Sequence, residues 1–275
     1  MGKIIGIDVG GSATKIVGFD ENGKLIHPML VRAHDQITSV YGALGKFTTE
    51  NKIELKDIKR IMVTGVGSSY VSDNIYGVPC YHVGEFPSIA RGGIYLSGLE
   101  RAVIVSMGTG TAMVYSDGDR SVYLGGTGVG GGTLVGLSKL LTGLSSIKNI
   151  VETAMDGNLS KIDLMVNDIT KKDVHPNLTP DLTAANFGKV SELASKADIE
   201  AGLINMVFES IAMQAVFAAR AKGISDIVLT GNLSNIPQAK GKFEEMNRLF
   251  DVNFIIPENS QYATVIGAAL ESMDK

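Results

Sequence analysis

A carboxylate, two glycines, two hydroxyls and a lysine fall within one segment near the start of the chain, DVGGSATK at positions 8–15. An apolar run at positions 4–7 precedes it, so we expect a turn that follows a buried strand. Glycines let backbone N–H groups come close to a phosphate, the hydroxyls and Lys15 add donors, and Asp8 can hold a hydrated Mg²⁺. The segment is not a Walker A loop, because G-x-x-x-x-G-K-[ST] occurs nowhere in the sequence. Taken alone, it is equally compatible with an ordinary hairpin turn.

The same arrangement occurs a second time in the chain. An apolar run at 103–107 leads into GTGT at 108–111, and a further strand is expected at 112–115. Two matched strand–glycine turn–strand hairpins predict a duplicated fold that closes on one phosphate chain. This pairing is typical of the actin, hexokinase and heat-shock chaperone superfamily, in which the two hairpins hold the nucleotide phosphates from opposite sides of a cleft.

The most glycine-dense stretch, GGTGVGGGT at 125–133, runs into an expected helix. N–H groups at a helix N-terminus form a natural anion site, so a phosphate or adenosine loop is predicted. A G-x-G-x-x-G match at Gly126, Gly128 and Gly131 does not indicate a Rossmann site. The preceding strand belongs to a hairpin, and no strand ending in an acidic residue follows at the required distance. A merely flexible glycine loop is the alternative.

Periodicity predicts the same order of elements in both halves. Each half has three strands, then a helix, a strand, a helix, a strand and a helix, which is βββαβαβα twice. In the first half, strands are expected at 4–7, 15–20, 24–29, 60–64 and 79–83, with helices at 36–50 and 88–99 and one through Tyr70. In the second half, strands are expected at 103–107, 112–115, 120–124, 226–230 and 253–256, with helices at 131–142, 147–154, 199–222, 237–250 and 262–273. The expected fold is α/β, with two ribonuclease H-like (actin-like ATPase) domains and a nucleotide cleft between them. We expect the domains at 1–98 and 99–275, with an insertion at about 155–198 and the last helix packing back at the hinge.

Composition limits the function classes. The 275 residues are 44% hydrophobic and 20% charged, with a net charge of −4, which is typical of a globular protein without a basic surface for nucleic acid. The single Cys80 excludes an intramolecular disulfide or a cysteine-based metal site and favours a reducing compartment. No signal peptide precedes the first strand, and the apolar stretch 203–219 is too short and polar to span a bilayer. We therefore expect a cytoplasmic protein with neither a membrane nor a nucleic-acid partner.

Two further polar residues follow expected strands. Glu85 is placed to accept the proton of a substrate hydroxyl that attacks a γ-phosphate, but an acid that opens a helix fits the same position. Asn232 ends a strand after Gly231, where either a nucleoside contact or a plain strand–helix turn is consistent with the pattern. The four histidines are scattered and show no metal-ligand spacing.

Nearly the whole chain resembles one family, the type II pantothenate kinases. The similarity includes DVGG with Lys15, GEF at 84–86, GTGT at 108–111 and the glycine stretch at 125–132. Its most specific part is DLTAANFG at 181–188, and it continues through 227–232 and 263–269. In this family Mg-ATP phosphorylates the primary hydroxyl of pantothenate, the first step of coenzyme A synthesis. The family is typically a homodimer built on long helices of the second domain, and 199–222 is a suitable helix here.

The resemblance implies a role for specific positions. It makes Glu85 the general base and Asp8 the residue that holds Mg²⁺ through water. It implies an ATP site formed by Asp8, Gly10, Gly11, Ser12, Ala13, Thr14, Lys15, Gly108, Thr109, Gly110, Gly131, Gly132, Thr133, Leu134, Val135, Ile147 and Asn232.

One position departs from the family pattern. The family carries an arginine that contacts substrate two residues before the Gly125 loop, and this chain has Tyr123 there. A phenol cannot supply the charge-assisted contact of a guanidinium. Arg120 is the nearest substitute, but its odd spacing from Tyr123 points it to the opposite face of a strand. Two alternatives to a pantothenate kinase therefore stay open: a kinase of another small hydroxylated molecule, and an ATP-binding switch without an acceptor. A related activator with an iron–sulfur cluster is disfavoured, because Cys80 alone cannot ligate the cluster.

Overall fold

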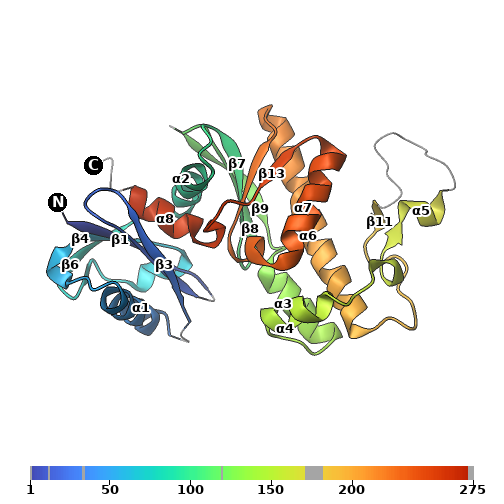
Figure 1. Ribbon diagram of the computed structural model, residues 1–275, viewed down its shortest axis with the longest axis horizontal. Helices are drawn as coiled ribbons and strands as arrows, with labels where there is room; N and C mark the ends of the chain where they lie inside the picture. Colours follow the sequence, from blue (N-terminus) through green and yellow to red (C-terminus); the bar gives the residue numbers. More distant parts are fainter. Residues whose placement is uncertain (1, 12, 33–34, 119, 171–181, 272–275) are drawn as a thin grey trace.

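The computed structural model describes residues 2–11, 13–32, 35–118, 120–170 and 182–271, and contains two main sheets (Figure 1). The first sheet has the order β3-β2-β1-β4-β6-β5. Its strands are β1 (Lys3–Val9), β2 (Thr14–Phe19), β3 (Leu25–Val31), β4 (Ile58–Thr64), β5 (Asn74–Ile75) and β6 (Val78–His82). β1 pairs antiparallel with β2 and parallel with β4, so the ends of all three strands meet at one edge.

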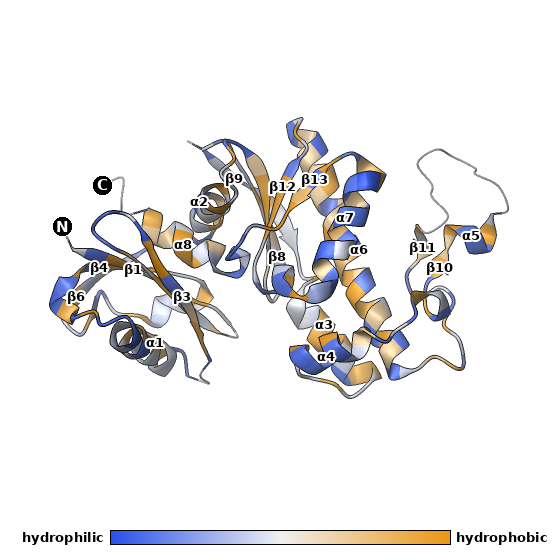
Figure 2. Ribbon diagram, viewed as in Figure 1, coloured by the Kyte–Doolittle hydropathy of each residue, from blue (hydrophilic) through white to orange (hydrophobic). Residues whose placement is uncertain are grey.

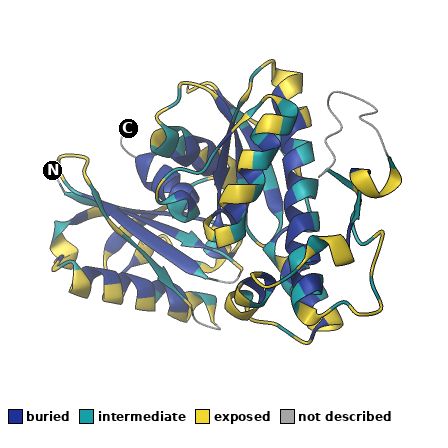
Figure 3. Ribbon diagram, turned by 45° about the vertical axis from the view of Figure 1, so that its right-hand side comes forward, coloured by how far each residue is buried: buried dark blue, intermediate teal, exposed yellow. Residues whose placement is uncertain are grey.

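Helix α1 (Gln36–Glu50) covers one face of this sheet. Val40, Leu44 and Phe47 recur at helical spacing and are buried, while the opposite side of the helix faces solvent (Figure 3). Asp35 begins the helix by accepting a hydrogen bond from the Thr38 N–H at 2.6 Å. The short turns η1 (Leu55–Asp57) and η2 (Val66–Tyr70) flank β4.

The second sheet repeats the topology of the first. Its order is β13-β12-β7-β8-β9, which matches β6-β4-β1-β2-β3 strand for strand. Its strands are β7 (Ala102–Met107), β8 (Thr111–Ser116), β9 (Ser121–Thr127), β12 (Asp226–Thr230) and β13 (Asn253–Ile255). The predicted duplicated, actin-like α/β fold is therefore confirmed.

Four helices share one core beside the second sheet: α3 (Gly131–Leu141), α4 (Ile147–Ala154), α6 (Lys196–Lys222) and α7 (Pro237–Phe250). Helices α6 and α7 contact the strands, while α3 and α4 pack mainly on α6. α6 is long and apolar enough to cross a membrane by length and composition alone. However, 56% of its apolar window is buried within the fold, and its hydropathy is mixed along its length (Figure 2). It is the central helix of the larger core, where Phe208 and Ile211 pack against strand β7 and helix α7.

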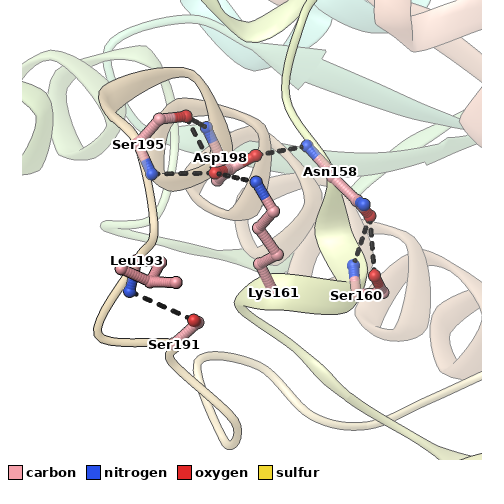
Figure 4. Close-up of polar contacts among 7 residues, drawn as sticks. All are labelled: Asn158, Ser160, Lys161, Ser191, Leu193, Ser195 and Asp198. Atoms are coloured by element: carbon pink, nitrogen blue, oxygen red, sulfur yellow. Dashed lines mark hydrogen bonds and ion pairs between the residues drawn. The ribbon is translucent and has the colours of Figure 1, made fainter.

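A capping box fixes the start of α6 (Figure 4). The Ser195 hydroxyl accepts a hydrogen bond from the Asp198 N–H, and Asp198 accepts one from the Ser195 N–H at 2.8 Å. Asp198 also accepts from the Asn158 N–H and pairs with Lys161 at 3.2 Å. These hydrogen bonds hold the pKa of the Asp198 carboxyl well below its usual range. They explain why the helix begins three residues before the predicted position 199.

Two helices cross between the sheets, and each packs on the sheet of the other half of the chain. α2 (Glu85–Ser97) contacts β7, β8 and β12, whereas α8 (Ala263–Leu270) contacts β1, β2 and β4. They meet through glycines, because a Cβ at Gly92 would collide with the Ala263 carbonyl and one at Gly267 with the Ser88 carbonyl. This close crossing joins the two halves without a linker (Figure 1).

The remaining elements show where the predicted pattern was incomplete. Position 70 ends the 3-10 turn η2 rather than lying in an α-helix, and α2 begins at Glu85 rather than at 88. The predicted insertion contains η3 (Leu159–Lys161), α5 (Val166–Ile169) and a hairpin of β10 (Leu164–Met165) with β11 (Thr183–Ala185). This hairpin projects from the side of the second half (Figure 1). The turns η4 (Asn232–Asn235) and η5 (Ser260–Tyr262) follow β12 and β13.

Candidate active site

A cleft of about 600 Å³ lies where the two glycine hairpins face each other. It is lined by residues of β1, β2, α2, β7, β8, β9 and the turn after β12. The predicted site residues that line it are Asp8, Gly10, Gly11, Ala13, Lys15, Glu85, Gly108, Thr109, Gly110, Tyr123 and Asn232. Residues from both halves of the chain therefore share one cavity.

Asp8 and Lys15 form the charged end of the cleft. They are direct partners in the antiparallel β1–β2 register, so their side chains lie on the same face. Burial raises the pKa of Asp8 to about 6; the positive charge of Lys15 opposes this rise and the negative charge of Glu85 adds to it. Lys15 is 8% exposed, and burial lowers its pKa. A cation withdrawn from water in this way interacts strongly with any phosphate that enters.

Gly65 and Gly231 occupy equivalent places after β4 and β12, and both line the cleft. Each has φ of +88°, a conformation that L side chains rarely adopt. A Cβ at Gly65 would collide with the Asp8 carboxylate, and one at Gly231 would lie 2.5 Å from the Met107 carbonyl oxygen. In the first half, Gly65 thus lets the turn after β4 pass close to the end of β1. In the second half, Gly231 lets the turn after β12 pass close to the end of β7.

The glycine loop before α3 supports the β7–β8 turn through its backbone. The Gly131 N–H donates to the Gly108 carbonyl at 2.9 Å, and the Gly132 N–H donates to the Thr109 carbonyl at 2.8 Å. The Thr133 hydroxyl donates to the Gly128 carbonyl at 2.7 Å. The Gly131 and Gly132 N–H groups thus hold the turn that lines the cleft, but Gly131, Gly132 and Thr133 are not themselves among the lining residues.

Several predicted positions lie away from the cleft. Thr14 is buried and accepts a hydrogen bond from the Ser39 hydroxyl at 2.8 Å. Leu134, Val135 and Ile147 pack in or against the large core of the second half. Arg120 lines a separate cavity beside α2 and so does not share the cleft with Tyr123. Ser12 lies outside the described residues.

Glu85 opens on the cleft from the first turn of α2. Partial withdrawal from water raises the pKa of its carboxyl, which makes it a better proton acceptor when it is ionised. Next to it, the Phe86 ring stacks on Tyr123 of β9 with ring centroids 4.0 Å apart and an interplanar angle of 13°.

Four further lining residues fall in stretches that were predicted to hold phosphate: Thr111 in the 108–111 hairpin, and Gly126, Thr127 and Gly128 in the glycine stretch. The sequence analysis chose no site residue at the other lining positions: Gly65, Val66, Ser106, Ala112, Gly231 and Thr264. A signal existed for the two turn glycines, since each directly follows an apolar strand at the same place in the repeat. Thr264 had none, because α8 reaches the cleft from the far end of the chain.

The cleft offers few side-chain ligands for a divalent cation. Among the residues that the structure describes, no group of three or more His, Cys, Asp or Glu side chains could hold a metal ion. Asp8 supplies one carboxylate beside Lys15 at the charged end of the cleft. Mg²⁺ in nucleotide enzymes is usually bound by one or two carboxylates together with phosphates and water, so this donor fits a nucleotide-bound Mg²⁺.

The duplicated sheets and the cleft between them define the class of protein as one with the two-domain actin-like fold. An activator of 2-hydroxyisocaproyl-CoA dehydratase from Clostridium difficile, solved with bound ADPNP, has a similar structure. Its TM-score is 0.69 at 19% identity, covering 99% of this chain and 94% of that one. A ROK family glucokinase from Streptomyces griseus, solved with glucose and AMPPNP, has a TM-score of 0.59 at 14% identity over the full length of both chains. These likenesses are in the fold alone.

Sequence comparison narrows the class to a family. The Fumble family model matches residues 46–242. The type II pantothenate kinase of Oceanobacillus iheyensis is 34% identical over 281 residues, covering 98% of this chain and all of the relative. That of Staphylococcus aureus is 30% identical, covering 96% of this chain and 97% of the relative. The chain belongs to the type II pantothenate kinase family, which confirms the resemblance noted in the sequence.

Proposed function

We propose that the chain transfers the γ-phosphate of ATP to the primary hydroxyl of pantothenate, the first step of coenzyme A synthesis. The observation that carries this proposal is the shared cleft, in which Glu85 opens beside the Asp8–Lys15 pair and both glycine turns. Family membership supports ATP as donor and pantothenate as acceptor. The chemistry then requires one base for the hydroxyl and a cradle for the phosphates, and the cleft offers both.

In this proposal Glu85 accepts the proton of the acceptor hydroxyl as its oxygen attacks the γ-phosphorus. The bond from that phosphorus to the bridging oxygen breaks, and ADP leaves with the electron pair. Lys15 and the N–H groups of Gly11, Thr109 and Gly110 bind the phosphates and offset their charge. The N–H groups of Gly10 and Gly108 instead donate within their own turns, to the Ala13 and Gly110 carbonyls. Asn232 lies beside the nucleoside.

Asp8 is the residue that would hold Mg²⁺, through a coordinated water. When bound, the ion supplies charge neutralisation of the phosphate oxygens. The rise in the pKa of Asp8 to about 6 disappears when a cation replaces its proton, so nucleotide and cation favour the ionised carboxylate together.

One observation favours a second acceptor. Among the described residues that line the cleft, Lys15 is the single cation, and it lies opposite Asp8 at the phosphate end. Tyr123 occupies the position of the family arginine and lines the acceptor end of the cleft. An acceptor with a carboxylate would bind better to a guanidinium than to this neutral ring. A small hydroxylated molecule without a carboxylate is therefore the second candidate.

We also propose the assembly and organisation of the protein. The domains are placed at 1–98 and 99–275, with the crossing of α2 and α8 as the hinge. On α6, Met206, Ser210, Met213 and Phe217 follow helical spacing on a face that is partly or fully exposed, and Phe217 is 59% exposed. This mostly apolar stripe is the surface on which a homodimer would form. The single cysteine favours the cytoplasm.

The substitution Glu85→Gln tests the base. It keeps the size of the side chain but removes the proton acceptor, so we expect pantothenate-dependent ADP release to fall by a factor on the order of 10²–10⁴. ATP binding, followed by titration with a fluorescent nucleotide, is expected to persist. Glu192→Gln, at an exposed loop position, is the matched control. Turnover by Glu85→Gln at the rate of this control would remove Glu85 from the mechanism.

A further inference from the structure

Tyr123 is aimed at the cleft by an irregularity in β9. Val114 of β8 pairs with Tyr123, whereas Met113 pairs with Gly125, so Leu124 is an extra residue in the strand. Gly125 has φ of +130°, which an L side chain would resist. Bulges of this kind re-aim the neighbouring side chain. The local backbone of β9 is therefore built to place the ring at position 123.

The ring of Tyr123 lies between a helix and its own strand. One face stacks on Phe86 with centroids 4.0 Å apart and planes 13° from parallel. Its hydroxyl lies over Gly126, where an added Cβ would be 3.0 Å from the phenol oxygen. The phenol thus fills the space that a glycine leaves open, and it lines the cleft from there.

The other partner, Phe86, directly follows Glu85 in the first turn of α2. Gly84 caps this helix and provides no side chain for a capping hydrogen bond. Within the turn, the Ser88 hydroxyl donates to the Gly84 carbonyl at 2.8 Å, which secures the backbone but not the direction of Glu85. Phe86 is 39% exposed, and its ring stacks on Tyr123 across the cleft-facing side of β9.

From this arrangement we infer that Tyr123 is a positioning residue, which acts through its stack on Phe86 to hold the first turn of α2 and the Glu85 carboxylate in place. The inference rests on the proposed function, because it assigns Tyr123 a part in the reaction that Glu85 serves. A stacked aromatic pair contributes on the order of 1 kcal/mol beyond its buried area, which favours one position of the first turn over others. The working part of Tyr123 is then its ring, and its hydroxyl is dispensable.

A double-mutant cycle tests the inference. Phosphorylation of pantothenate is measured for the wild type, Phe86→Ala, Tyr123→Ala and the double variant. We expect each single variant to lose about tenfold in kcat, since a displaced general base is costly, with the KM for ATP unchanged. The double variant is expected to lose no more than either single variant, because both remove the same contact. Val122→Ala, an exposed neighbour on β9, is the matched control.

Two further readouts separate positioning from loss of stability. Tyr123→Phe keeps the stack and is expected to restore kcat relative to Tyr123→Ala. The pH profile of kcat/KM is expected to shift its acid limb to lower pH in Tyr123→Ala, because a less confined Glu85 meets more water and its pKa falls. Thermal melting of each variant identifies any that has simply lost folded protein. A smaller amount of folded protein lowers the measured rate at every pH but does not move the acid limb of the kcat/KM profile.

Three results would overturn the inference. The first is that the losses in kcat of the two single variants multiply in the double variant. The second is that Tyr123→Phe is as impaired as Tyr123→Ala. The third is that Tyr123→Ala changes only the KM for the acceptor. The last result would mean that Tyr123 contacts the acceptor directly. Failure of the proposed function is distinct, because the wild-type protein itself would then not phosphorylate pantothenate. The same cycle is then run with whichever acceptor stimulates ADP release.

Discussion

The turn after β4 provides the most quantitative prediction. Gly65 has φ of +88° and ψ of +166°, a region that is essentially restricted to glycine and costs other residues about 1–3 kcal/mol. A Cβ there would also collide with the Asp8 carboxylate and lie 2.7 Å from the Val9 carbonyl oxygen. Because part of this obstacle is backbone, crowding adds about 1–3 kcal/mol. Gly65→Ala is therefore expected to destabilise the protein by about 2–6 kcal/mol.

For a chain of this size, about 2–4 °C of melting temperature corresponds to each kcal/mol, so Gly65→Ala is expected to melt at least about 4 °C below the wild type. Differential scanning calorimetry measures the shift, and nucleotide titration measures the displacement of Asp8. We expect ATP binding to weaken more than the loss of stability alone explains, because the carboxylate must move.

Substitutions at two other glycines separate the backbone strain at Gly65 from the crowding of the added Cβ. Gly77 has φ of +85° but nothing within 4 Å of an added Cβ, so Gly77→Ala isolates backbone strain. Gly45 lies in α1 with open space around it, and Gly45→Ala is expected to stabilise the protein by about 0.5–1 kcal/mol. The reasoning is refuted if Gly65→Ala melts at the temperature of Gly77→Ala or above and binds ATP normally.

Two further predictions concern the charged end of the cleft and the surface of α6. The pKa of Asp8 is about 6 in the folded protein against an ordinary 3.8, so folding favours the protonated form and this contribution to stability is lost as the pH rises through 6. Asp8→Asn is expected to melt above the wild type at pH 7 and to match it near pH 4, and a lower melting point at pH 7 would contradict this sign. Phe217→Glu places a charge on the exposed apolar stripe of α6 and is expected to halve the molar mass measured by light scattering. An unchanged mass would exclude this stripe as the dimer surface.

The regular elements followed from local pattern. Helices α1, α4 and α7 and strand β12 have the predicted bounds, because each carries its apolar residues at one clear period between turn residues. The start of α2 was predicted three residues late, since Gly84 offers no capping side chain to mark it. The β10–β11 hairpin pairs Met165 with Thr183, and a pairing over that separation leaves no local signal.

The cleft was predictable where its residues come from the two hairpins. Asp8, Lys15, Thr109 and Glu85 were chosen from residue type and position, and they line one cavity. The glycine loop at 131–132 was expected to present free N–H groups, but these donate to carbonyls of the β7–β8 turn. Its partners lie more than twenty residues earlier in the chain, so only the folded structure reveals which acceptor takes them.

The identity of the phosphorylated acceptor decides whether the protein is a pantothenate kinase. Purified protein is incubated with Mg-ATP and, in parallel, with pantothenate, pantetheine or a set of sugars, and the products are analysed by mass spectrometry together with ADP release. If the proposed function holds, phosphorylated pantothenate forms together with ADP in equal amounts, and both are lost in Glu85→Gln. ADP release stimulated by another acceptor, or by none, with pantothenate unmodified, would contradict it.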